Sequence, residues 1–243
     1  MAELAFHTLR DGRRIAYRQW HGDSPTLVFL PGYMSDMAGC KATALAGWAA
    51  AQGRACLLLD YSGCGESPGD FSAGTLGRWC DEAVALIEAR TAGPVVLVGS
   101  SMGGWVMLLA AQALGSRVSA LVGIAAAPDF THWGYTVDER RRLAAGEIVL
   151  RANPYGAEPM PTYAGFWRDG EARRQLDRVI AFDGPVRLLH GQDDTDVPPE
   201  ISLTLAAALR SLDVQVALVK GGDHRLSRDS DIALLIHTVA SLS

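Results

Sequence analysis

A serine between two glycines is the feature with the clearest chemical potential. Residues 99–103 are Gly-Ser-Ser-Met-Gly, a GxSxG sequence with Ser101 at its centre. The apolar run 94–98 precedes the motif and a helix-forming run follows it, which is the strand–turn–helix context that exposes such a serine at a sharp bend. Glycine at both ends of the motif leaves room for the bend. We therefore predict that Ser101 is a nucleophile and that Ser100, one position before the apex, points elsewhere.

A histidine and several carboxylates late in the chain could activate this hydroxyl, because a serine needs an adjacent base. His224 follows the apolar run 214–219 and is the candidate base. Three carboxylates follow the run 185–189 and compete to orient that base: Asp193, Asp194 and Asp196. The order serine, acid, histidine fits groups that stand at the ends of successive parallel strands. His190, at the end of the earlier run, is interpreted as a structural hydrogen-bonding residue.

Attack on a carbonyl creates an oxyanion, and two backbone N–H groups are expected to bind it. One donor should be the residue after the nucleophile, Met102, and the other should lie in the loop after the run 26–30. That loop contains Gly32, which allows a close backbone approach, and we place the second donor at Tyr33. The glycine-rich segment 60–67 lacks the lysine of a phosphate-binding loop and is interpreted as a tight structural loop beside the site.

Short apolar runs alternate with helix-forming segments along most of the chain. Apolar runs of this length suit strands that are buried on both faces. Strands separated by helices imply a mostly parallel, doubly wound α/β sheet with helices on both sides. The predicted strands span residues 5–9, 14–19, 26–30, 55–60, 94–99, 118–127, 185–189 and 214–219, and the predicted helices span residues 40–52, 75–91, 101–114, 199–211 and 230–241.

One segment interrupts this alternation. Residues 129–182 show no strand signal and hold eight of the 18 aromatic residues, together with three prolines. Because a structureless stretch of this length is improbable in a compact domain, we predict a helical cap inserted into a single domain of residues 1–243. The aromatic rings suggest an apolar acyl-binding pocket, although they could equally form the core of the cap.

Composition excludes several classes of function. The 243 residues carry 22 Lys and Arg against 27 Asp and Glu, a net charge of −5, so nucleic acid is not an expected partner. No apolar run approaches a membrane span of roughly 18 residues. Scattered histidines without HExxH or CxxC patterns predict no metal and no cofactor. The four cysteines suggest reduced thiols and residues 1–15 show no secretory signal, so we expect a cytoplasmic protein, monomeric by default.

Two further segments carry a resemblance to a known superfamily. DYSGCGES at residues 60–67 resembles the DxxGxGxS segment of the α/β-hydrolase superfamily, and HGQDDTDVP at residues 190–198 resembles its HGxxDxxVP segment. The resemblance covers nearly the whole chain and implies an α/β-hydrolase fold. It also implies that Asp194 is the acid, which completes a triad with Ser101 and His224.

A closer resemblance, to one group of serine hydrolases, rests on LPGYMSDMAGCKA, TLGRW, VGSSMGGWVMLLAA, RLLHGQDD and GDHRL. These segments resemble the mitochondrial palmitoyl-protein thioesterases that are also described as mycophenolic acid acyl-glucuronide esterases. The likeness is strong over residues 30–105 and from residue 187 onward, and weaker in the cap. It implies cleavage of carboxyl esters or thioesters through an acyl-enzyme on Ser101, with a small molecule or an acylated protein as substrate. Because the presequence of that group is missing here, we expect a bacterial, cytoplasmic counterpart.

Other functions would use the same residues. An acyltransferase, a perhydrolase and a carbon–carbon bond hydrolase would share the triad. A ligand receptor that keeps the fold without catalysis is an alternative of another class, and labelling of Ser101 by a fluorophosphonate that requires His224 would separate it from an enzyme.

Overall fold

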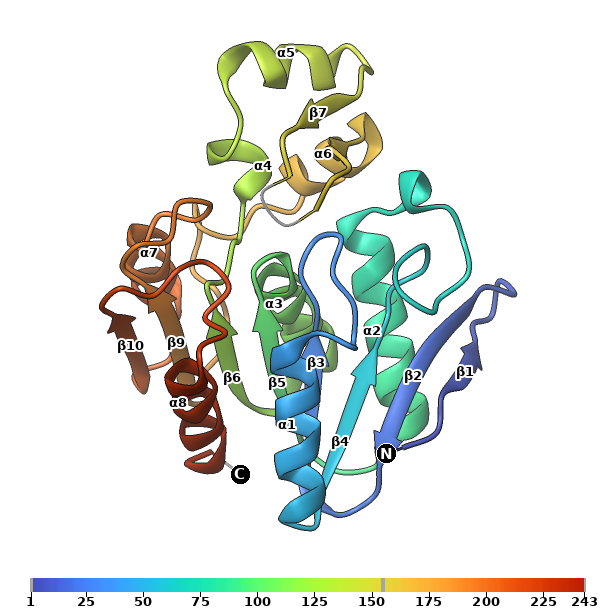
Figure 1. Cartoon of the computed structure of the whole chain (residues 1–243), viewed down its shortest axis with the longest axis vertical. Coiled ribbons are helices and arrows are strands. Elements are labelled where there is room, and N and C mark those ends of the chain that lie inside the picture. Colours follow the sequence, from blue (N-terminus) through green and yellow to red (C-terminus); the bar gives the residue numbers. More distant parts are fainter. Residues whose placement is uncertain (1, 154–155, 243) are drawn as a thin grey trace.

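The computed structural model describes residues 2–153 and 156–242. Its centre is an eight-stranded sheet in the order β1-β2-β4-β3-β5-β6-β9-β10 (Figure 1). The strands β1 and β2 pair antiparallel, as do β2 and β4, and all other neighbours are parallel. The prediction of a mostly parallel α/β-hydrolase sheet is confirmed. The strand bounds are β1 Ala5–Thr8, β2 Arg14–Trp20, β3 Asp23–Leu30, β4 Arg54–Leu59, β5 Val95–Ser100, β6 Val118–Ile124, β9 Val186–Gly191 and β10 Val214–Val219.

Helices cover both faces of the sheet. Val96 and Val98 of β5 pack in one buried cluster with α1 and α8, whereas Val95 and Leu97 face a second cluster with α2, α3 and α7. Strands buried on both faces in this way explain the uninterrupted apolar runs of the sequence. No helix in the described part of the chain is long and apolar enough to cross a membrane. The helix bounds are α1 Cys40–Ala51, α2 Leu76–Arg90, α3 Met102–Leu114, α7 Glu200–Ala208 and α8 Asp229–Ala240, with short 3-10 turns at Phe71–Ala73 and Gly115–Arg117.

The cap segment, residues 129–182, lies above the carboxyl ends of the central strands (Figure 1). It contains the helices α4 (Phe130–Trp133), α5 (Val137–Ala144) and α6 (Ala164–Glu171), but also two antiparallel strands, β7 (Val149–Arg151) and β8 (Met160–Thr162). The cap contains helices as predicted, whereas its two short strands were not predicted. Strands of three residues, one of which contains a proline, are too short to produce a periodic signal. Positions 154 and 155 of this segment lie outside the described residues, and the division into one domain with an insertion stays a prediction.

The strand β6 ends three residues before the predicted boundary at 127. Ala125 has a positive φ of 45°, so the chain turns out of the sheet directly after Ile124. The N–H of Ala127 then donates to the carbonyl of Ser101 at 3.0 Å. The alanines that extend the apolar run therefore leave the strand, and Ala127 hydrogen-bonds to the turn that carries Ser101.

Candidate active site

Ser101 occupies a strained turn between β5 and α3. Its φ of 54° and ψ of −120° are unusual for a residue with a side chain, and such strain is typical of functional positions. A Cβ on Gly99 would lie 2.4 Å from the carbonyl oxygen of Gly103, and a Cβ on Gly103 would lie 2.0 Å from that of Leu30. Both glycines of the motif are therefore required by close backbone contacts, as the sequence predicted.

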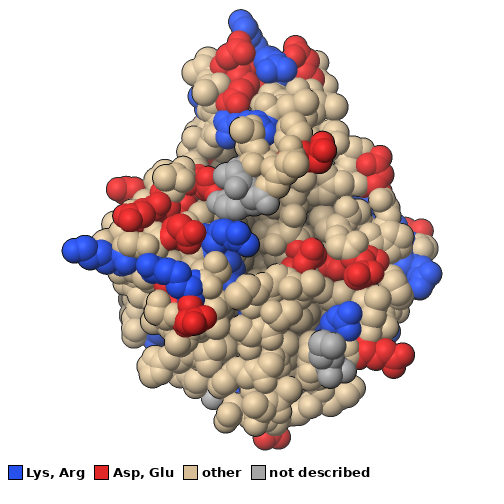
Figure 2. Space-filling view, in the orientation of Figure 1, with Lys and Arg blue, Asp and Glu red and all other residues tan. Residues whose placement is uncertain are grey.

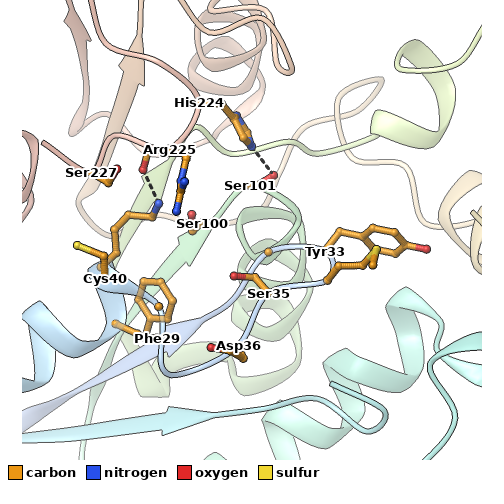
Figure 3. A pocket seen from close by; sticks show the side chains of 15 residues that line it. Phe29, Tyr33, Ser35, Asp36, Cys40, Ser100, Ser101, His224, Arg225 and Ser227 are labelled. Atoms are coloured by element: carbon orange, nitrogen blue, oxygen red, sulfur yellow. Dashed lines mark hydrogen bonds between the residues drawn. The ribbon is translucent and has the colours of Figure 1, made fainter. Parts of the chain in front are cut away.

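The structure brings His224 and Asp194 to Ser101. The Nε2 atom of His224 is 3.0 Å from the Oγ of Ser101, and its Nδ1 atom is 2.8 Å from Oδ2 of Asp194 (Figure 3 shows the first contact). A carboxylate only accepts hydrogen bonds, so Nδ1 donates to Asp194 and Nε2 is left to accept the hydroxyl proton of Ser101. The side chain of Asp194 is fully buried, whereas Asp193 and Asp196 are exposed.

Several donors surround the Asp194 carboxylate. Its Oδ1 accepts hydrogen bonds from the N–H groups of Asp196 at 2.9 Å and Val197 at 2.8 Å. Burial by itself would raise the pKa of Asp194, but hydrogen bonds from His190, His224 and Val197 outweigh it and hold the pKa well below its usual range. Asp194 is thus an anion throughout the neutral range.

His190 is one of these donors, in agreement with its interpretation as a structural hydrogen-bonding residue. Its fully buried ring places Nε2 at 2.9 Å from the carbonyl oxygen of Val197 and 3.2 Å from Oδ2 of Asp194. A carbonyl cannot donate, so Nε2 carries the proton. The other ring nitrogen, Nδ1, is 2.6 Å from the hydroxyl of Ser202 in α7. His190 is the fifth residue of β9, and its position in the sequence does not predict the contact with Asp194.

The two predicted oxyanion donors flank Ser101. Met102 is the first residue of α3, where an N–H group has no intrahelical acceptor. Tyr33 follows Gly32, on which a Cβ would lie 3.3 Å from the Cβ of Ser101, so this loop packs directly against the nucleophile.

The side chain of Tyr33 ties the oxyanion loop to the cap. Its hydroxyl donates to the carbonyl of Pro161 in β8 at 2.8 Å, and its ring lies 4.8 Å from that of Phe166 in α6. Burial raises the pKa of Tyr33 far above its usual range, so the hydroxyl remains protonated and able to donate. Cap and oxyanion loop are therefore mechanically linked at this residue.

The glycine-rich segment 60–67 supports the same loop from behind. The buried carboxylate of Asp60 accepts hydrogen bonds from the N–H groups of Met37 at 2.7 Å and Glu66 at 2.9 Å. A Cβ on Gly65 would lie 2.3 Å from Oδ2 of Asp60, and Gly65 has a positive φ of 50°, so only glycine fits there. This matches the interpretation of the segment as a structural loop beside the site.

Two cavities meet at Ser101 and His224. The first, which we name the cap pocket, has a volume of about 160 Å³ and an apolar lining from the cap and its neighbours: Met102, Phe130, Trp133, Tyr135, Met160 and Val197. The second, the basic pocket, has a volume of about 220 Å³ and extends away from the cap toward α1, with Lys41 and Arg225 in its lining. Sequence reasoning missed both cations. Arg225 is next to the predicted base in the sequence, and this position could have indicated a role at the site. Lys41 lies in an alanine-rich helix, where nothing in the sequence indicates such a role.

The aromatic residues of the cap divide between two roles. Phe130, Trp133 and Tyr135 line the cap pocket, whereas Phe166 is buried in the core against Tyr33. Within residues 2–153 and 156–242, no three His, Cys, Asp or Glu side chains are grouped as a metal site requires. The chemistry that the described residues favour is nucleophilic attack by an activated hydroxyl between an apolar and a basic cavity.

Comparison with known proteins identifies the family. Residues 27–238 match the alpha/beta hydrolase family. The human mitochondrial palmitoyl-protein thioesterase ABHD10 is 36% identical over 243 residues, which cover 98% of this chain and 79% of that protein. The solved structure of alpha/beta hydrolase domain-containing protein 10 from mouse has a TM-score of 0.92 at 36% identity, covering 99% of this chain and 98% of that one.

A bacterial structure is equally similar. A putative hydrolase from Agrobacterium vitis S4 has a TM-score of 0.92 at 36% identity and covers 100% of this chain and 98% of its own. The predicted likeness to the thioesterase group is confirmed, while the cytoplasmic location and the monomeric state stay predictions. The chain belongs to the alpha/beta hydrolase family and is an ester-bond hydrolase.

Proposed function

We propose that the protein is a serine hydrolase that cleaves thioesters or carboxyl esters through an acyl-enzyme on Ser101. The proposal rests on one observation, the continuous hydrogen-bonded chain from the Ser101 hydroxyl through His224 to the buried Asp194. The palmitoyl-protein thioesterase names of its relatives support the same substrate class, a small-molecule or protein-bound acyl thioester.

The geometry supports a two-step mechanism. As the Oγ of Ser101 attacks the acyl carbon, its proton passes to Nε2 of His224, and the N–H groups of Met102 and Tyr33 bind the oxyanion. The imidazolium formed is stabilised by Asp194 and then donates its proton to the leaving sulfur or oxygen, which departs. A water molecule next attacks the acyl-enzyme, with His224 again taking a proton, and the carboxylic acid and free serine are released.

The cap pocket supports an apolar acyl chain. Aromatic and aliphatic side chains make up most of its lining, which also includes Ser101. Burial of each methylene group contributes about 0.8 kcal/mol, so a chain of several carbons would be held firmly. Because cap residues form much of the lining of this pocket, their identity should govern the preferred acyl length.

The experiment is hydrolysis of an octanoyl thioester by the wild type, Ser101→Ala and Ser100→Ala. We expect Ser101→Ala to lose at least about 1,000-fold in kcat and to lose labelling by a fluorophosphonate, because the nucleophile is gone. Ser100→Ala removes the adjacent hydroxyl and serves as the matched control, with turnover and labelling retained. Turnover by folded Ser101→Ala near the wild-type rate would refute the proposal.

A further inference from the structure

The basic pocket contains two cationic side chains that have no role in the proposed mechanism. It opens beside Ser101 and His224, and the two cations come from different elements, Lys41 from α1 and Arg225 from the loop after β10. Figure 3 labels Arg225 together with Ser101 and His224. Figure 2 shows a hollow below the cap, with both basic and acidic side chains on one side of it and acidic side chains on the other. Asp36 also lines the pocket, but its Oδ1 accepts a hydrogen bond from the N–H of Ala38 at 2.8 Å.

The ammonium group of Lys41 is held in a partly buried position, where a charge costs free energy of solvation. Its Nζ donates to the backbone carbonyl of Arg225, which uses one of its three N–H groups and anchors α1 to the loop of the catalytic histidine. Burial and the neighbouring Arg225 charge lower the pKa of Lys41, against a partial compensation from Asp223 and Asp231. An anion in the pocket would offset both the lost hydration and the repulsion between the two cations.

The placement of the two cavities separates the two halves of a substrate. An acyl carbon at Ser101 can extend its chain into the cap pocket, whose lining is mostly apolar. Arg151 and Asp196 also line this pocket, but the guanidinium of Arg151 is already paired with the carboxylate of Glu139, so an apolar chain fits there better than an anion. The leaving group then lies on the opposite side of the scissile bond, in the direction of Lys41 and Arg225. His224, which lines both cavities, stands between the halves and can deliver a proton to the departing atom.

We propose that Lys41 and Arg225 form a specificity site for an anionic group, a carboxylate or a phosphate, on the leaving-group side of the substrate. This inference rests on the proposed serine hydrolase function and adds the chemistry of the leaving group to it. The two residues bind the anion by charge-assisted hydrogen bonds and take no part in bond cleavage.

The test compares three octanoyl thioesters that differ only in the leaving thiol. The thiols are 3-mercaptopropionamide, which is neutral, 3-mercaptopropionate, which carries a carboxylate, and 2-mercaptoethyl phosphate. The readout is the ratio of kcat/KM for each anionic ester to that for the neutral ester, because a ratio corrects for any general loss of activity. We expect the wild type to favour at least one anionic ester by about 5- to 10-fold at low salt and the preference to fall as ionic strength rises.

Three variants assign that preference to the pocket. Lys41→Gln keeps a donor for the Arg225 carbonyl, and Arg225→Gln keeps that carbonyl itself, so each removes a charge with little change to the loop. Both variants should reduce the ratio toward 1. Lys220→Met removes a charge from the exposed start of the same loop, outside the pocket lining, and should leave the ratio as in the wild type.

The outcomes separate the two proposals. Equal turnover of all three esters by the wild type, or a preference that survives both Lys41→Gln and Arg225→Gln, would overturn the anion site. In either case hydrolysis of the neutral ester that depends on Ser101 would leave the serine hydrolase function standing. Failure of the wild type to cleave any of the esters through Ser101 would instead remove the function on which the inference rests.

Discussion

Replacing Asp194 with asparagine tests the orientation of the catalytic histidine. The amide oxygen can take the place of Oδ1 and still accept from the N–H groups of Asp196 and Val197. The amide NH₂ group must then occupy the place of Oδ2, at 2.8 Å from Nδ1 of His224 and 3.2 Å from Nε2 of His190. Since NH₂ only donates, His224 is forced into the tautomer that carries its proton on Nε2.

The magnitude follows from that tautomer. With a proton on Nε2, the ring cannot accept the proton of Ser101, and the imidazolium also loses its carboxylate partner. We expect kcat to fall by about 1,000- to 10,000-fold, which corresponds to about 4–5 kcal/mol of barrier. The new amide NH₂ group and the N–H of His190 would face each other as two donors without an acceptor. The loss of this hydrogen bond should lower the free energy of unfolding by about 1–3 kcal/mol.

The assay is hydrolysis of the neutral octanoyl thioester, with folding of each variant checked by circular dichroism and thermal melting. Asp193→Asn is the matched control, because Asp193 is the adjacent exposed carboxylate of the same loop. It should keep kcat within about twofold, as expected for a surface change. A folded Asp194→Asn with kcat within tenfold of the wild type, or an equal loss in Asp193→Asn, would refute the assignment of the acid.

Two further predictions concern the scaffold of the site. Gly103→Ala should destabilise the fold by about 3 kcal/mol, because the new Cβ would lie 2.0 Å from the carbonyl oxygen of Leu30. The control Gly47→Ala places its Cβ in open space on α1 and should stabilise the fold by about 0.5–1 kcal/mol. Equal urea midpoints for the two variants would contradict the predicted clash at Gly103. Hydrogen bonding to Arg151 lowers the pKa of Glu139 to about 2, so its stabilisation of the cap is complete above the unfolded pKa near 4.5 and is lost as pH falls toward 2. The wild type should therefore be more stable than Glu139→Gln by about 1 kcal/mol at pH 7 after solvent screening, and this difference should shrink by pH 2.5. A difference in urea unfolding that does not change with pH would contradict the role of the Glu139–Arg151 pair.

The fold was predictable because its strands have a strong and simple pattern. Runs such as 27–30 and 95–98 are apolar at every position because both faces of the sheet are covered, and the helices between the strands impose parallel pairing. Prediction failed in the cap, where β7 and β8 have three residues each and depend on pairing with each other. It also failed at the end of β6, because the chain leaves the sheet at the positive φ of Ala125, a conformation that alanine as a residue type does not favour.

Residue types and local spacing were enough to predict the candidate nucleophile, the candidate base and the turn that carries Ser101, because a GxSxG bend depends mainly on contacts between near neighbours in the chain. Which carboxylate reaches His224 is a matter of tertiary structure, since only Asp194 of the three candidates is turned into the buried space where the ring lies. Ser101 and His224 are 123 residues apart, and the order of the strands brings them within 3.0 Å. The same long-range folding places Lys41 beside Arg225, and nothing in the local sequence of either residue encodes their proximity.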